Sequence, residues 1–400
     1  MRVLILTDAF TKPLRGQRMT ALAKNLRNLG FDVTIANELL PGDDFRPEVE
    51  YLGVPFYPDK SRIKYLLLWV IDKLFWYKDY KFERTVEKNL KISSFDVIIC
   101  STFFEFPLRA ARRLSKRYSL PLIVDLRDII EQWGQASVLK HTPKSKIQDL
   151  FADLYKSRCL KERNKALLAA KACTTVSPWH QSFLKQYNKS CFLVYNGYDE
   201  GKYFPAHIPS EHFILSYIGR LYDFTFRDPR ALLGAIRELR SEGMIPQAML
   251  IWHVEREMIT PTKELMAEYH LSDICSIEGF ISRDDAALLL QKSSISILLT
   301  NHPGESQAKG IVTTKFFEAL GCEKPVLCTP TDEGSLSDTI NYTNAGIASS
   351  EVDEIKTFIM EKYREWESHG FTMQNVCHKE EFSRSFQAKQ FADIISTVCR

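Results

Sequence analysis

The feature that most constrains this chain is an alternation of short apolar runs and amphipathic helices that occurs twice along its length. In the first half, residues 3–6 form an apolar run, residues 19–29 carry apolar side chains at helical spacing, and residues 31–36 form the next run. Such runs are typical of strands in parallel sheets, and their order predicts a right-handed strand–helix–strand unit. The pattern continues to the turn at Asn196-Gly197 through the runs 95–100, 120–125, 172–177 and 192–195.

A second set of alternating elements follows a hinge predicted near residues 201–210. Strands are expected at 213–219, 248–252, 277–280, 295–300, 325–328 and 345–348, and helices at 229–239, 284–292, 314–320 and 382–399. Two such sets predict an α/β fold with two doubly wound, Rossmann-like domains facing across a cleft. We place the domains at residues 1–200 and 201–380, with a C-terminal helix at 381–400 that can cross back to the first domain.

Charge and cysteine content exclude several classes of protein. The chain has 400 residues and a net charge of +3, which gives no case for nucleic acid as the main partner. Its nine cysteines form no Cys-x-x-Cys pair, and no histidine–carboxylate spacing matches a zinc site, so no metal is expected. An acid follows the first apolar run directly, unlike in a signal peptide, and we expect a cytoplasmic protein.

The most apolar stretch, residues 65–77, has two interpretations. Asp72 and Lys73 interrupt it, and it is shorter than the roughly 20 residues that a membrane-spanning helix needs. Nearby basic residues allow contact with the face of a membrane. Because the stretch is apolar on all sides for about two turns, burial inside the first domain is the preferred interpretation.

Residues 309–326 carry the clearest candidate site. A polar loop runs into a short helix, for which Thr313 or Thr314 is a suitable N-cap. The amides and the positive dipole end at such a helix start suit a diphosphate, and Lys315 can neutralise it. Glu318 lies one turn after Thr314 and can accept hydrogen bonds from a ribose diol. The alternative is a capped surface helix with a Lys–Glu pair.

Further candidates follow predicted strands. Gly219 allows close approach of a ligand, and Arg220 can stabilise a leaving diphosphate, although a surface ion pair is the favoured interpretation of Arg220 taken alone. Asp125-Leu126-Arg127-Asp128 either lines a cleft or forms a local ion-pair network. Gly16, between Arg15 and Arg18, either approaches a ligand or forms a turn before the helix. The remaining candidates are Glu105 for the acceptor side and Gly279 for the nucleotide.

Several of these segments together resemble the GT-B glycosyltransferases of the group-one, or family-four, type. The segment from Thr314 to Val326 resembles the family's donor-site pattern Lys-x-x-Glu followed by Gly-x-Pro-Val. Asp125 to Asp128 resembles an Asp-x-Arg-Asp segment of the branch that builds bacterial surface polysaccharides. Short matches in the same order extend the resemblance over nearly the whole chain, namely Thr175-Val176-Ser177, Tyr195-Asn196-Gly197-Tyr198-Asp199 and Tyr217-Ile218-Gly219-Arg220.

The resemblance implies roles for individual residues. By this resemblance, Glu318 would bind the donor ribose and Arg220 the donor diphosphate. Arg227 and Asp128 are our further catalytic candidates, and Arg18 and Arg127 are candidates for the acceptor side. No obligatory metal or other cofactor is implied, and retention of anomeric configuration is typical. Two positions depart from the family pattern. Gly310 stands where an acid is frequent, Glu305 is out of register with it, and Arg227 replaces a lysine at a different spacing.

The sequence therefore predicts a glycosyltransferase that moves a hexosyl or N-acetylhexosaminyl unit from a nucleoside-diphosphate sugar to a glycan or lipid-linked acceptor. The expected setting is surface polysaccharide biosynthesis in the cytoplasm, with peripheral contact to the inner membrane face as an option and no nucleic acid involved. The alternative is a non-catalytic GT-B-like subunit that binds a nucleotide or a partner, which the glycine at position 310 favours. A sugar-nucleotide epimerase is a third hypothesis.

Overall fold

The computed structural model describes residues 1–8, 13–40, 48–56, 62–103, 105–133, 146–300 and 309–400. They divide into two compact units, one of residues 1–195 with 384–400 and one of residues 196–383. The chain passes from the first unit to the second after Tyr195, upstream of residues 201–210, where the sequence suggests a hinge. The C-terminal helix belongs to the first unit, and each unit is described below by itself.

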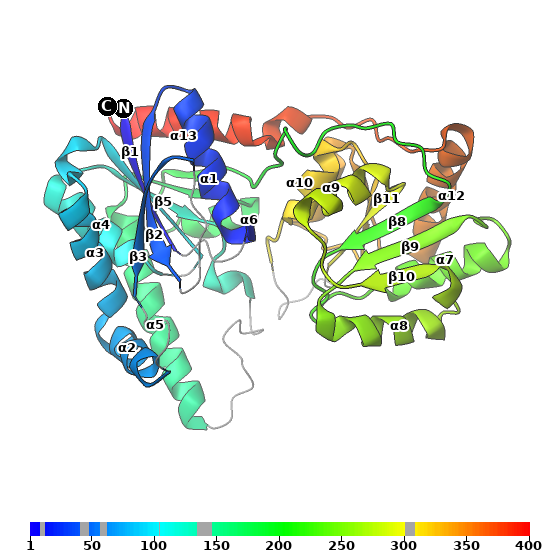
Figure 1. Ribbon diagram of the computed structural model, residues 1–400, viewed down its shortest axis with the longest axis horizontal. Helices are drawn as coiled ribbons and strands as arrows, with labels where there is room; N and C mark the ends of the chain where they lie inside the picture. The colour runs from blue at the N-terminus through cyan, green and yellow to red at the C-terminus, as the bar shows by residue number, and fades with distance from the viewer. Residues whose placement is uncertain (9–12, 41–47, 57–61, 104, 134–145, 301–308) are drawn as a thin grey trace. The chain divides into compact units, whose positions relative to one another are not determined.

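The described residues of the first unit form a seven-stranded parallel sheet with the order β3-β2-β1-β4-β5-β6-β7 (Figure 1). Its strands are β1 (Arg2–Thr7), β2 (Asp32–Leu39), β3 (Glu50–Pro55), β4 (Val97–Thr102), β5 (Leu122–Leu126), β6 (Ala172–Thr175) and β7 (Cys191–Leu193). Its helices are α1 (Pro13–Asn28), α2 (Arg62–Phe75), α3 (Tyr77–Asn89), α4 (Leu108–Tyr118), α5 (Lys146–Ala169), α6 (Pro178–Leu184) and α13 (Arg384–Val398).

Alternate residues of each strand pack on opposite faces of this sheet. Val3 and Ile5 of β1 lie in the core beneath α1 and α13, and these two helices run side by side (Figure 1). Leu4 and Leu6 face the other core, which α3, α4 and α5 cover. Because both faces are covered, the central strands read as continuous apolar runs.

Helix α2 departs from the expectation that the apolar stretch is buried. Ile63, Leu67, Val70 and Leu74 recur at the spacing of one helix face and are 39–84% exposed, and Phe75 beside them is 73% exposed. The preferred interpretation is therefore wrong for these residues, since their face of α2 is not packed against the core. None of the helices in the described part of the chain is long and apolar enough to cross a membrane.

The described residues of the second unit form a six-stranded parallel sheet with the order β10-β9-β8-β11-β12-β13. Its strands are β8 (Phe213–Ile218), β9 (Ala248–His253), β10 (Cys275–Glu278), β11 (Ile295–Leu299), β12 (Val326–Thr329) and β13 (Gly346–Ala348). Its helices are α7 (Arg230–Ser241), α8 (Ile259–Glu268), α9 (Arg283–Lys292), α10 (Thr314–Gly321), α11 (Ser335–Thr343) and α12 (Val352–His369). Helices α7 and α12 pack together over one face of this sheet, with Phe213, Tyr217 and Trp252 beneath them.

The prediction of an α/β fold with two Rossmann-like doubly wound sheets is confirmed. Gly16 was expected before the first helix, but it is the fourth residue of α1. Pro13 begins this helix, at a position where its missing N–H group costs no hydrogen bond. Strand β3 was missed because Glu50, Gly53 and Pro55 interrupt its apolar pattern.

Candidate functional site

In the second unit, Lys315 lies against the end of strand β8. The Lys315 ammonium occupies the space beside the Gly219 backbone, where a Cβ atom on residue 219 would come within 1.5 Å of Nζ. Nζ also lies 4.9 Å from the centroid of the Tyr217 ring. A residue without a side chain is therefore required at position 219 for Lys315 to take this place. The contact joins two segments that the sequence singled out separately.

The surroundings of Lys315 favour its neutral form. Burial and, to a smaller extent, the nearby positive charge of Arg227 lower the pKa of Lys315 to about 7, although Glu318 and Glu255 act in the opposite direction. At neutral pH the site therefore holds a lysine close to its titration midpoint. A phosphate placed beside it would restore the charge, because an opposite charge favours the protonated form.

Arg227 belongs to the same cluster despite its different spacing. It donates a hydrogen bond of 2.9 Å to the carbonyl of Leu299 at the end of β11, and it hydrogen-bonds the hydroxyl of Tyr217. The Tyr217 hydroxyl in turn donates to the carbonyl of Arg220 at 2.8 Å. Arg220 itself is exposed. Strands β8 and β11 are neighbours in the sheet, so the cations of Arg227 and Lys315 lie near the carboxyl ends of these strands and the start of α10.

Glu255 is a residue of this cluster that the sequence analysis did not assign. Its carboxylate accepts hydrogen bonds from the backbone N–H groups of Leu221, at 2.8 Å, and Tyr222, at 2.6 Å. Tyr222 has a φ of 64°, in the left-handed region that is uncommon for a bulky residue. Glu255 thus fixes the loop that carries Arg220. The only sequence signal was its place just after strand β9.

Helix α10 positions Glu318 beside the cluster. Phe316 and Phe317 are fully buried and hold the helix against the core. Thr313 is the N-cap residue, but its side chain makes no capping hydrogen bond, and Thr314 is the exposed first residue of the helix. Glu318, one turn later, is half-buried and hydrogen-bonds the hydroxyl of Tyr203. Burial and this carboxylate both raise the pKa of Tyr203, which stays a neutral donor.

Two glycines near the site differ in what they require. Gly310 has a φ of 67°, a conformation that favours glycine, which gives a physical reason for the absence of an acid at this position. Glu305 lies outside the described residues. Gly279 has open space where a Cβ would stand, and its carbonyl lies 2.9 Å from Nδ1 of His253.

In the first unit, Asp125 forms a buried ion pair with Arg18. The closest approach is 3.1 Å, with the Arg18 side chain 8% exposed and the Asp125 side chain fully buried. Ser101 and Thr174 each donate a hydrogen bond of 2.7 Å to the same carboxylate. Burial alone would raise the pKa of Asp125, but the charge and hydrogen bonds of Arg18 and the two hydroxyls lower it overall.

This network also links the sheet to the backbone of residues 194 and 195, where the chain leaves the first unit. Arg18 also donates to the carbonyls of Val194 and Tyr195, at 2.9 and 2.7 Å. A network of this kind holds α1, β4, β5 and β6 in register. The interpretation of Asp125 as part of a local ion-pair network is the one that the geometry favours, and a role for Arg18 in binding an acceptor stays a prediction.

The other candidates of the first unit follow the neighbouring strands β4 and β5. Arg127 forms an ion pair of 2.9 Å with Asp8, and Asp128 accepts a hydrogen bond of 2.8 Å from Gln132. Glu105 follows β4 and accepts a hydrogen bond from Tyr155, and burial raises its pKa. Among the residues that the structure describes, no group of three or more histidine, cysteine, aspartate or glutamate side chains is arranged to hold a metal ion.

Comparison with known proteins places this geometry in a recognised fold. No protein-family model matches the chain, and no curated protein matches it by sequence. Solved structures match over its whole length. Sucrose-phosphate synthase from Thermosynechococcus elongatus has a TM-score of 0.66 at 15% identity, covering 100% of this chain and 99% of its own.

Two further structures extend the comparison. HepE from Anabaena, solved in complex with UDP-glucose, has a TM-score of 0.63 at 14% identity, covering 99% of this chain and all of its own. The UDP-GlcNAc 2-epimerase from Neisseria meningitidis, solved with UDP-GlcNAc, has a TM-score of 0.56 at 11% identity, with coverage of 99% and 100%. A synthase, a protein solved with UDP-glucose and an epimerase solved with UDP-GlcNAc thus share this architecture. With its two parallel sheets and full-length match to these structures, the chain has the GT-B fold.

Proposed function

We propose that this chain is a glycosyltransferase that uses a nucleoside-diphosphate sugar bound by its second unit. The observation that carries the proposal is the cluster of Lys315, Arg227 and Glu318 where α10 begins and strands β8 and β11 end. In parallel α/β sheets, ligands bind at the carboxyl ends of the strands. Two cations suit a diphosphate, and a carboxylate one helical turn away suits a ribose diol.

The cluster also provides the stabilisation that the reaction needs. As the bond between sugar and diphosphate breaks, negative charge grows on the leaving phosphate. Lys315, Arg227 and Arg220 would offset this charge, together with the amides of Thr313 and Thr314 at the start of α10. Gly219 makes room for Lys315, and Gly279 would allow close approach of the ligand. We propose no metal for this step, because the charge is offset by side chains.

The finer parts of the proposal concern the sugar and its acceptor. We propose transfer of a hexosyl or N-acetylhexosaminyl unit, with retention of configuration, to a glycan or lipid-linked acceptor of a surface polysaccharide. The first unit would supply the acceptor side, with Arg127 and Glu105 as candidate residues and Gly16 and Arg18 in α1. Asp128 is its candidate catalytic residue. The resemblance of residues 125–128 to the polysaccharide branch supports this assignment.

We further propose a cytoplasmic protein whose helix α2 contacts the inner face of a membrane. The exposed apolar face of α2 supports this, because Leu67, Val70 and Leu74 are apolar side chains in water. Lys64 is exposed at the start of the helix and would pair with anionic headgroups. Sedimentation with vesicles of anionic phospholipid should be lost in a Leu67→Glu/Leu74→Glu variant. Equal sedimentation of both proteins would refute the membrane contact.

Nucleotide binding and sugar transfer together test the function. A nucleoside diphosphate at about 100 times its dissociation constant should stabilise the protein by about 2.7 kcal/mol, visible as a thermal shift. Glu318→Ala should weaken binding, and transfer to an acceptor should fall in parallel. Binding without transfer would favour the non-catalytic subunit, an alternative that the glycine at position 310 supports because an acid is frequent there. Binding followed by epimerisation of the sugar would favour the epimerase, and no binding at all would refute the proposal.

A further inference from the structure

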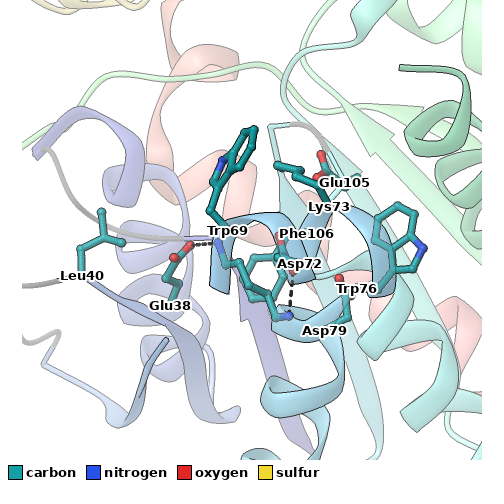
Figure 2. A pocket seen from close by; sticks show the side chains of 10 residues that line it. Glu38, Leu40, Trp69, Asp72, Lys73, Trp76, Asp79, Glu105 and Phe106 are labelled. Carbon is teal, nitrogen blue, oxygen red and sulfur yellow. Dashed lines mark hydrogen bonds and ion pairs between the residues drawn. The ribbon is translucent and has the colours of Figure 1, made fainter. Parts of the chain in front are cut away.

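A pocket of about 370 Å³ opens in the first unit, on the side of the sheet where β2 and β4 end (Figure 2). Glu38 near the end of β2 and Glu105 after β4 line it, together with Asp72 and Lys73 of α2. Its size is at the lower end of the range of about 300–1,000 Å³ for small-molecule sites. It therefore has room for a compact ligand of one or two rings.

Helix α2 presents two different faces, and one of them forms the pocket wall. Trp69, Asp72 and Lys73 recur at i, i+3 and i+4 and line the pocket, while Leu67 and Leu74 lie on the exposed apolar face. The polar side of this helix thus turns toward the protein and its apolar side toward solvent. This is the reverse of an ordinary surface helix, and it places the polar side chains of Asp72 and Lys73 in the lining of the pocket.

Each charged group of the pocket is held in place by a partner from the protein. The ammonium of Lys78 lies 2.7 Å from Glu38, and the Lys78 backbone N–H donates to Asp72 at 2.8 Å (Figure 2). Asp79 accepts a hydrogen bond of 3.0 Å from the N–H of Ala110. A carboxylate has about four acceptor sites, so each of these acids retains capacity for further hydrogen bonds. These hydrogen bonds and ion pairs hold the polar groups of the pocket in fixed positions before a ligand binds.

A second set of contacts links Lys73 to Glu105. Lys73 donates a hydrogen bond of 2.5 Å to the hydroxyl of Tyr155, which in turn donates to the Glu105 carboxylate. Burial raises the pKa of Asp79 to about 7 and also raises the pKa of Glu105. The pocket therefore combines carboxyl groups and ammonium groups without a large excess of either charge near neutral pH. Such a lining offers both donors and acceptors, and it suits an uncharged ligand rich in hydroxyl groups.

Trp76 also lines the pocket, and its backbone has a left-handed conformation. It stands between α2 and α3 with φ 57° and ψ 44°, a left-handed geometry that is an outlier for a bulky residue. The guanidinium groups of Arg109 and Arg158 lie 5.6 and 5.4 Å from the centroid of its ring. Strain held in this way is typical of binding sites. Trp69 is the second indole of the lining, and flat apolar faces of this kind pack against the C–H face of a sugar ring.

We propose that this pocket binds one saccharide unit, with Trp69 and Trp76 against the ring and Asp72, Asp79 and Glu105 on its hydroxyl groups. Its assignment as the acceptor site rests on the function proposed above, whereas saccharide binding itself does not. Because the exposed apolar face belongs to the same helix, an acceptor sugar attached to a lipid would have its lipid portion beside α2.

The test titrates the whole protein with a panel of methyl glycosides of neutral hexoses and N-acetylhexosamines, observed by ligand-detected NMR. At least one glycoside should bind with a dissociation constant on the order of 1 mM. Trp69→Ala should weaken this binding at least fivefold. Tyr80→Ala removes another exposed aromatic side chain, on the adjacent helix α3 and outside the pocket, and should leave it unchanged.

Nucleoside-diphosphate binding is measured on the same variants and should be equal in all of them, because the nucleotide site lies in the other unit. The proposal is overturned if no glycoside binds while the nucleotide does, or if Trp69→Ala and Tyr80→Ala behave alike. Failure of nucleotide binding would instead refute the proposed function, and glycoside titration would still decide the role of the pocket.

Discussion

The low pKa of Lys315 makes nucleotide binding depend on pH in a defined direction. A diphosphate binds more tightly to the charged lysine, whose pKa in the free protein is about 7. The bound phosphate raises that pKa, so affinity is greatest below pH 7 and falls as pH rises through and beyond it. The fraction of charged lysine falls from about one in eleven at pH 8 to about one in a hundred at pH 9. Because a neutral side chain still allows weaker binding, the dissociation constant should rise by about twofold to sixfold between pH 8 and pH 9.

The assay is isothermal titration of a nucleoside diphosphate between pH 7.5 and pH 9, above the range near pH 6 in which its terminal phosphate titrates. Lys315→Arg should give a flat profile, because arginine stays protonated throughout. Lys315→Met should also be flat, and at pH 7 its affinity should be about tenfold to a hundredfold weaker, as expected for loss of a hydrogen bond to a charged group. A flat profile in the wild type, or an equal slope in Lys315→Met, would refute the reasoning.

Three further predictions concern stability and positioning. Asp125→Asn should cost about 3–5 kcal/mol in urea denaturation, because it leaves Arg18 buried without its charge partner. Since the pKa of Asp125 is lowered on folding, this stabilisation should be present above the ordinary carboxyl pKa and lost as pH falls through the folded value. A decrease of less than about 1 kcal/mol in the unfolding free energy of Asp125→Asn would contradict the role of the ion pair. Glu255→Gln should weaken nucleotide binding with little change in melting temperature, as expected of a residue that orients the Arg220 loop, whereas unchanged affinity would leave Glu255 a structural residue only. Gly310→Ala should destabilise the protein by about 1 kcal/mol in the same denaturation assay because of its positive φ, and an unchanged midpoint would count against the left-handed conformation.

Helices and strands that are encoded by consecutive residues could be predicted from the sequence. Strands β1 and β8 are apolar runs, so their place in parallel sheets followed from residue type alone. The start of α10 and the spacing of Lys315 and Glu318 within it were also local features. For this reason the fold and the position of helix α10 were predicted correctly, whereas the nucleotide site stays a prediction.

Contacts between residues far apart in the sequence could not be predicted from such local patterns. Arg18 and Asp125 are 107 residues apart, and nothing in either segment indicates that they pair. The place of Lys315 beside Gly219 depends in the same way on how α10 packs against β8. The exposure of α2 was misjudged because periodicity shows which residues share a face, but not whether the protein covers that face.

The central claim is that the second unit holds a diphosphate at the start of α10, and a crystal structure with a bound nucleoside diphosphate tests it most directly. The account predicts phosphate oxygens within hydrogen-bonding distance of the Lys315 ammonium and the ribose hydroxyls on the Glu318 carboxylate. A nucleotide bound elsewhere, with Glu318 still turned to Tyr203 and no ligand beside Lys315, would contradict it.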